Sequence, residues 1–199
     1  MRYLGVLLIA MVPYSIYHYA TTREIEHANG VLVAKDPAQS DPDDAAPIAD
    51  GAFTLQPRAQ FVADARVLGR ERYHLGKLAD IAPLDIAAGW GPMSDTAVLS
   101  RVDISQGNRF YYWHYDNEPP IPREDIQTHS ANWHLLPADA AVWHVLRDIR
   151  VGEVVHLEGK LVDIESPQFG VMRTSLTRND TGPGACEIIY VEAVSLSGG

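Results

Sequence analysis

The sequence predicts an α+β protein: an N-terminal transmembrane helix, then a mainly antiparallel, β-barrel-like (OB-like) domain with a few short helices. Residues 3–20 form an apolar segment without charged residues, and several later segments alternate apolar and polar residues with the period of a strand. A long strand pattern with Gly159 near its middle precedes two more, as at the start of a small closed barrel. A doubly wound fold is disfavoured because helices and strands do not alternate and no glycine-rich phosphate loop is present.

The N-terminal segment predicts a membrane anchor. As a helix, residues 3–20 would span about 27 Å, enough for the hydrocarbon core of a bilayer. A cleaved signal peptide and a soluble helix are the alternatives, but His18 stands where a cleavage site needs a small residue. We therefore expect residues 1–22 to be an anchor or signal segment, with the membrane as a partner through residues 3–20 and the rest of the chain exported.

Composition divides the rest of the chain. Residues 36–52 contain three prolines and five aspartates, so we interpret residues 23–52 as a Pro/Asp/Ala-rich spacer. With 46% apolar residues in the chain, residues 53–199 are expected to form one globular α+β domain. The net charge of −10 argues against a nucleic-acid partner.

Periodicity predicts the elements of this domain. Phe61, Ala63, Ala65 and Val67 share one face of a predicted strand. The apolar spacing after Pro137 is that of a helix. In chain order, we expect a strand over 59–69, short helical turns over 83–101, a β-prone aromatic run over 109–115, a helix over 138–149, and strands over 154–164, 172–177 and 186–196.

The first polar and aromatic stretch is 89–95. Glycines on both sides of Trp90, followed by Pro92, predict a tight corner, and Asp95 precedes an apolar helical turn as an N-cap would. A ligand-facing Trp90, with Asp95 beside it, is the alternative interpretation.

The second stretch is 129–134. If it is extended, Ser130, Asn132 and His134 lie on one face and form a candidate binding patch. His129 falls on the other, apolar face, so the two histidines do not form a metal pair. Because no third ligand is evident either, we expect no metal site.

The third stretch, 174–187, contains the only cysteine. Arg178 and Asp180 are candidate binding residues that could pair across a turn, and Cys186 begins an apolar strand. We interpret Cys186 as a packing residue. The alternative is a nucleophile activated by His129 or His134. Nothing in the sequence indicates a cofactor.

These three stretches, together with 104–106 and 109–113, resemble an uncharacterised family of bacterial exported or membrane-anchored proteins. The resemblance covers about 61–192 and implies no known activity. It implies a bacterial origin. Together with the predicted anchor at residues 3–20, this predicts a single-pass protein of the inner membrane with its C-terminal domain in the periplasm.

The sequence thus predicts an envelope-facing binding or accessory module without catalysis, with an envelope protein as a partner. Two alternatives remain. One is a small periplasmic Cys-His hydrolase using Cys186 with His129 or His134. The other is an assembly subunit whose aromatic run 110–115, including the candidate binding residue Tyr112, is an interface.

Overall fold

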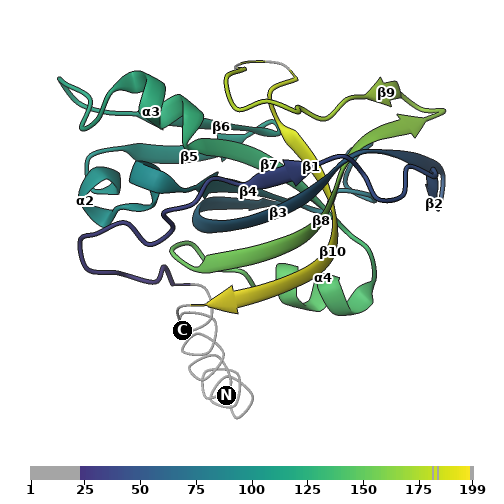
Figure 1. Ribbon diagram of the computed structural model, residues 1–199, viewed down its shortest axis with the longest axis horizontal. Helices are drawn as coiled ribbons and strands as arrows, with labels where there is room; N and C mark the ends of the chain where they lie inside the picture. The colour runs from purple at the N-terminus through teal and green to yellow at the C-terminus, as the bar shows by residue number, and fades with distance from the viewer. Residues whose placement is uncertain (1–22, 181, 183, 198–199) are drawn as a thin grey trace, which may run out of the picture.

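The computed structural model describes residues 23–180, 182 and 184–197, which form a mixed α+β domain made mostly of sheet. The predicted α+β class is therefore confirmed. The elements are β1 (Ala38–Ser40), β2 (Ile48–Asp50), β3 (Phe53–Arg72), β4 (Leu84–Gly89), the 3-10 helix η1 (Gly91–Ser94), α2 (Thr96–Leu99), β5 (Asp103–Gly107), β6 (Phe110–His114), α3 (Arg123–Thr128), β7 (Ser130–Pro137), α4 (Ala140–Leu146), β8 (Val154–Ser166), β9 (Gly170–Met172) and β10 (Glu187–Ser197) (Figure 1).

The predicted anchor, residues 1–22, lies outside the described residues. Within the described part of the chain, no helix is both long enough and apolar enough to cross a membrane.

Five strands pair in a cycle, in which the last strand pairs again with the first. β3 pairs with β4, β4 with β7, β7 with β10 and β10 with β8, and β8 pairs again with β3. Every pair in this cycle is antiparallel except β7–β10, which is parallel. The alternating residues Phe61, Ala63, Ala65 and Val67 of β3 lie in the enclosed apolar core, as predicted.

Strand β8 changes its apolar phase at its middle. Leu157 and Leu161 pack in the main core, whereas Val162 and Ile164 belong to a second apolar cluster. Gly159 lets the backbone of β10 approach β8 closely, because a Cβ atom at this position would lie 2.0 Å from the carbonyl oxygen of Tyr190. The register irregularity lies in the partner strand, between residues 191 and 193 of β10.

The predicted spacer, residues 23–52, is instead packed against the domain. Strands β1 and β2 both pair with β3, and Val33 is buried in the main core. Farther upstream, the Ile25 amide donates to the carbonyl of Val151 at 2.9 Å. The predicted spacer residues are thus tied to the domain by backbone pairing of two short strands and by the buried Val33, neither of which the Pro- and Asp-rich composition indicates.

Three other boundaries differ from the predictions. Residues 84–89 form a fully buried strand, and the helical turns begin only at Gly91. Residues 173–177 are irregular rather than a strand, since β9 ends at Met172. The predicted helix over 138–149 is confirmed but shorter, and its N-cap is Asp139, whose carboxylate accepts from the Val142 amide at 2.8 Å.

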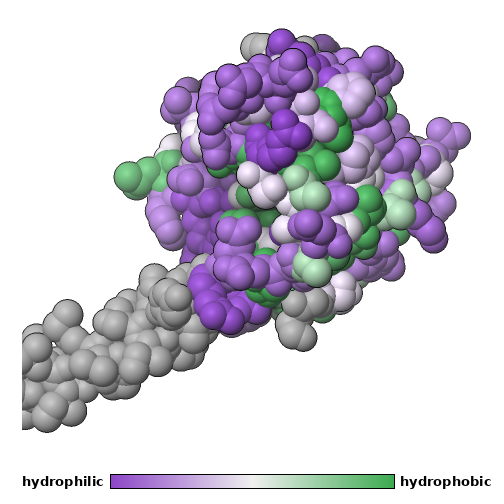
Figure 2. Space-filling model, turned by 90° about the vertical axis from the view of Figure 1, so that its left-hand side faces the viewer, coloured by the Kyte–Doolittle hydropathy of each residue, from purple (hydrophilic) through white to green (hydrophobic). Residues whose placement is uncertain are grey.

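The β5–β6 hairpin forms a separate two-stranded sheet beside β7. Its aromatic residues pack with α3 and the β4–η1 corner in a third apolar cluster (Leu68, Ala87, Met93 and Ile126, with Tyr111, Trp113 and Tyr115 against them). On the face of the molecule that Figure 2 shows, polar side chains predominate and hydrophobic ones form small patches between them.

Candidate functional site

Strand β7 places alternate side chains in two environments. Ala131, Trp133 and Leu135 point into the main core. Ser130 and Asn132 point the other way, toward the β5–β6 hairpin, where Asn132 Oδ1 accepts from Gln106 Nε2 at 2.9 Å. The alternation follows the prediction, but the hairpin buries the polar face as well, so these residues line a pocket rather than an open patch.

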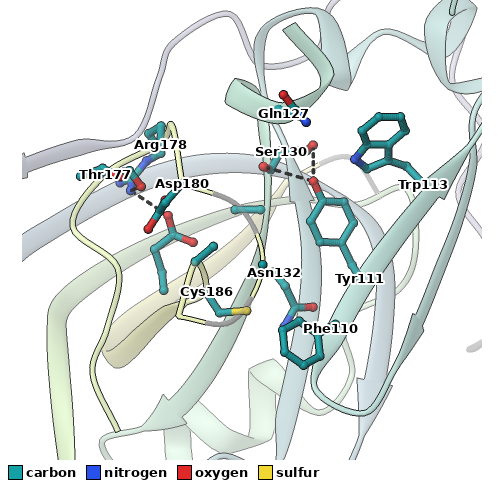
Figure 3. A pocket seen from close by; sticks show the side chains of 14 residues that line it. Phe110, Tyr111, Trp113, Gln127, Ser130, Asn132, Thr177, Arg178, Asp180 and Cys186 are labelled. Atoms are coloured by element: carbon teal, nitrogen blue, oxygen red, sulfur yellow. Dashed lines mark hydrogen bonds and ion pairs between the residues drawn. The ribbon is translucent and has the colours of Figure 1, made fainter. Parts of the chain in front are cut away.

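This pocket lies between the hairpin, β7 and residues 173–186, hereafter the 173–186 segment. Its volume is about 190 Å³, and Figure 3 shows the side chains around it. The lining residues come from β6, α3, β7, the 173–186 segment and the start of β10: Phe110, Tyr111, Trp113, Gln127, Ser130, Ala131, Asn132, Thr177, Arg178, Asp180, Gly182, Ala185, Cys186 and Glu187.

One side of the pocket is aromatic and neutral. The Tyr111 hydroxyl and Ser130 Oγ lie 2.8 Å apart, and Ser130 Oγ donates to the carbonyl oxygen of Ile126. Burial raises the pKa of the Tyr111 phenol, so it stays protonated at neutral pH. This side can present ring faces, a hydroxyl and amide groups to a ligand.

The opposite side is charged. Arg178 Nη1 lies 2.7 Å from Glu187 Oε1, and Asp180 Oδ2 accepts from Ser175 Oγ at 2.7 Å. Arg178 therefore pairs with Glu187, whereas the sequence predicted a pair with Asp180. Burial raises the pKa of Glu187 to about 7, although the Arg178 guanidinium acts in the opposite direction.

Cys186 lies between the two sides. Its thiol is partly buried and donates to the carbonyl oxygen of Arg109, with Sγ 3.8 Å from that oxygen. Burial, reinforced by the negative charges of Glu187 and Asp85, raises its pKa to about 12. The side chain is therefore a neutral thiol at physiological pH, not a thiolate.

An Asp-Arg-His cluster borders the pocket. Asp85 Oδ1, at a fully buried position of β4, lies 2.9 Å from Arg109 Nη1 and 2.9 Å from His134 Nδ1. Despite this short distance, His134 Nδ1 makes no hydrogen bond to a described residue. His134, Arg109 and Cys186 also line a neighbouring apolar recess beside β9.

The hairpin tip holds Arg109 in position. Asn108 and Arg109 both have positive φ angles, of 53° and 70°, as a two-residue turn of type I′ requires. Arg109 lies over the ring of Tyr73 with its guanidinium carbon 3.5 Å from the ring centroid, and it donates to the Ala82 carbonyl at 2.8 Å. These contacts stabilise Arg109 in a backbone conformation with positive φ, which residues other than glycine rarely adopt.

The remaining predicted residues lie elsewhere. Trp90 is buried in the core, stacked on Trp133 with centroids 6.0 Å apart, so the structural-corner interpretation applies. Asp95 caps α2 by accepting from the Ala97 amide at 2.8 Å. Tyr112 is 53% exposed, and alternation along β6 turns it away from Tyr111 and Trp113.

His129 does not join Cys186. Its Nδ1 lies 2.9 Å from the Asp125 carbonyl oxygen, and its ring packs against Gly91. The structure therefore brings together Ser130, Asn132, Arg178 and Asp180 of the predicted binding residues, with His134 in the adjoining recess.

Sequence reasoning missed Glu187 and Asp85. Glu187 directly precedes an apolar run, and Asp85 lies inside one. A carboxylate at such a position needs a hydrogen-bonding or charged partner when the run is buried. Which residues become the partners, here Arg178 and Arg109, depends on the geometry of the loops, and the pattern of apolar and polar residues does not specify that geometry.

The described ranges contain no group of three His, Cys, Asp or Glu side chains placed to hold a metal ion. Comparison of the chain with protein-family models, with curated proteins and with solved structures finds no match.

Proposed function

We propose that the described residues form the binding module of a membrane-anchored bacterial envelope protein, and that this module binds a small ligand without catalysis. The pocket between β6, β7 and the 173–186 segment is the observation that carries the proposal. It combines aromatic faces with converging amide, hydroxyl and charged groups, as small-ligand sites do. Its volume of about 190 Å³ is below that of sites for drug-sized molecules, so the ligand is small.

We further propose that the five paired strands are an OB-like barrel. Numbered along the chain, β3, β4, β7, β8 and β10 neighbour one another in the order 1-2-3-5-4-1. OB domains bind ligands on the face of their second and third strands and with the loop between the fourth and fifth. The pocket is built on the corresponding strand β7 and on the 173–186 segment, which supports binding as the function.

The alternative is a Cys-His hydrolase, and one observation favours it: Cys186 and His134 line the same recess. A nucleophilic cysteine needs a lowered pKa, whereas burial and nearby carboxylates raise that of Cys186 to about 12. The thiol also bonds to a backbone carbonyl rather than to an imidazole. Binding therefore fits these contacts better than hydrolysis.

The proposed location is the bacterial inner membrane, with residues 3–20 as a single-pass anchor and the domain in the periplasm. Ile25 is already bonded to the domain, five residues after Ala20, so the domain would lie close to the bilayer. The described chain begins near the lower end of the domain, and the 173–186 segment lies at the upper end (Figure 1). The pocket would then face away from the membrane, toward the proposed envelope partners.

A thermal-shift screen of the full-length chain in detergent micelles tests the binding function. The panel contains monosaccharides, amino acids, amines, amino alcohols and dicarboxylates. We expect at least one compound to raise the Tm of the wild type, because a ligand that binds only the folded state stabilises it. Gln127→Ala, an exposed pocket position, should abolish the shift, and Gln168→Ala, an exposed glutamine outside the pocket, should not.

Two results would contradict the proposal. One is that no compound in the panel raises the Tm of the wild type without also raising that of Gln127→Ala. The other is rapid alkylation of Cys186 by iodoacetamide in the folded protein at neutral pH, lost in His134→Ala, which would favour the hydrolase.

A further inference from the structure

The charged side of the pocket has more carboxyl groups than cations. It contains two carboxylates, Glu187 and Asp180, and one guanidinium, Arg178. Two other titratable groups near Glu187, the Cys186 thiol and the Tyr111 phenol, have raised pKa values and are neutral at physiological pH. Above the Glu187 pKa of about 7, where both carboxylates are ionised, this side of the pocket has a net charge of −1, and a bound cation favours that ionised form.

The ion pair at its centre is incompletely satisfied. Glu187 is 1% exposed, and only its Oε1 is paired with Arg178, while its Oε2 is buried without a hydrogen-bond partner. Arg178 Nε is likewise buried without one. Buried polar atoms are normally hydrogen-bonded, so an unpaired acceptor and an unpaired donor in one pocket wall require an explanation.

We propose that the pocket binds a small amino alcohol, with its ammonium group at Glu187 Oε2 and its hydroxyl oxygen at Arg178 Nε. This inference rests on the proposed binding function and names the ligand class of the same site. The ammonium group donates a charge-assisted hydrogen bond and balances the negative charge. The hydroxyl accepts from Nε without adding a negative charge beside the carboxylates.

The opposite side of the pocket fits the rest of such a ligand. Phe110 and Tyr111 face the charged residues across the pocket (Figure 3). Aromatic faces pack against an apolar body and also attract a cation. An anionic ligand would instead meet Asp180 and Glu187, because Arg178 is already paired.

Four compounds with one phenyl ring each separate charge from hydrogen bonding. They are phenylglycinol (amine and hydroxyl), 1-phenylethylamine (amine alone), 1-phenyl-1,2-ethanediol (two hydroxyls) and mandelate (hydroxyl and carboxylate). Isothermal titration of the full-length chain in detergent, at a pH above the Glu187 pKa of about 7, should show phenylglycinol binding at least about tenfold more tightly than the diol. The amine without a hydroxyl should rank between them, and mandelate should not bind.

Two variants test the assignment of the ammonium group. Asp180→Asn changes an exposed residue and should reduce the preference for phenylglycinol over the diol, and Glu187→Gln should reduce it to within about threefold. Glu165→Gln, an exposed carboxylate outside the pocket, is the matched control and should leave it unchanged. If Glu187→Gln does not fold, the result with Asp180→Asn decides.

The outcomes separate this inference from the binding function. If the diol binds as tightly as phenylglycinol and Gln127→Ala abolishes both, the ligand class is wrong and the binding function stands. If none of the four binds while another class in the screen does, the ligand class is also wrong. If nothing binds in either experiment, both proposals fail.

Discussion

Glu187 is a carboxyl group with only 1% of its surface exposed. Burial raises its pKa to about 7 from an ordinary value of 4.5. Between these two pH values, the folded protein binds more protons at Glu187 than the unfolded chain does. The contribution of Glu187 to the free energy of unfolding should therefore fall as the pH rises through this interval. The contribution is fully present below pH 4.5 and is lost above about pH 7.

We predict that Glu187→Gln removes this pH dependence, since glutamine does not titrate. The measurement is the Tm of the wild type and of the variant at several pH values across the interval. The slope is the readout, because the substitution also leaves Arg178 without a charged partner and can lower the Tm at every pH. Glu165→Gln is the control. An unchanged slope in Glu187→Gln would show that this carboxyl titrates normally.

At the scale of elements, the described residues before β1 are fixed to the domain. Val33 is 4% exposed in the main core, its amide donates to Ser94 Oγ at 3.0 Å, and its carbonyl accepts from the Gly91 amide at 2.7 Å. The segment also passes close to Gly152, where a Cβ atom would lie 2.1 Å from the Ile25 carbonyl oxygen.

Val33→Asp should therefore destabilise the whole domain, because it places a carboxylate in the core. We expect a loss of about 3 kcal/mol, or a Tm lower by roughly 6–12 °C. Val31→Asp is the matched control: Val31 is 49% exposed, and its change should cost no more than about 0.5 kcal/mol. Thermal unfolding of the full-length chain in detergent measures both. Equal Tm values would mean that this segment is detached, as a spacer would be.

The same elements show what the sequence can and cannot predict. The strand over 59–69 and the alternation along β7 follow from local periodicity, and the structure contains both. The packing of residues 23–52 depends on backbone pairing with β3, which composition does not report. The exact partner of Arg178 depends on how the 173–186 segment folds back, so proximity in sequence favoured Asp180 over the buried Glu187.

At the scale of the whole molecule, the pocket joins parts of the chain that are distant in sequence. The hairpin, β7 and the 173–186 segment each contribute lining residues, and the pairing of β7 with β10 places the end of that segment beside β7. Ser130, Asn132, Arg178 and Asp180 could be nominated from the sequence because they lie in polar stretches. The sequence could not show that these residues surround one cavity, because the parallel pairing of β7 with β10 is a long-range contact.

The indole N–H signals of the four tryptophans test most directly whether this pocket is a binding site. Trp113 lines the pocket, Trp90 and Trp133 lie in the main core, and Trp143 lies on α4. The ¹⁵N-labelled full-length chain in detergent micelles is titrated with a compound that raises its Tm, and Trp113→Phe assigns the signal. We predict that the Trp113 signal shifts and that of Trp143 does not. A compound that shifts Trp143 and leaves Trp113 unchanged would contradict the proposed site.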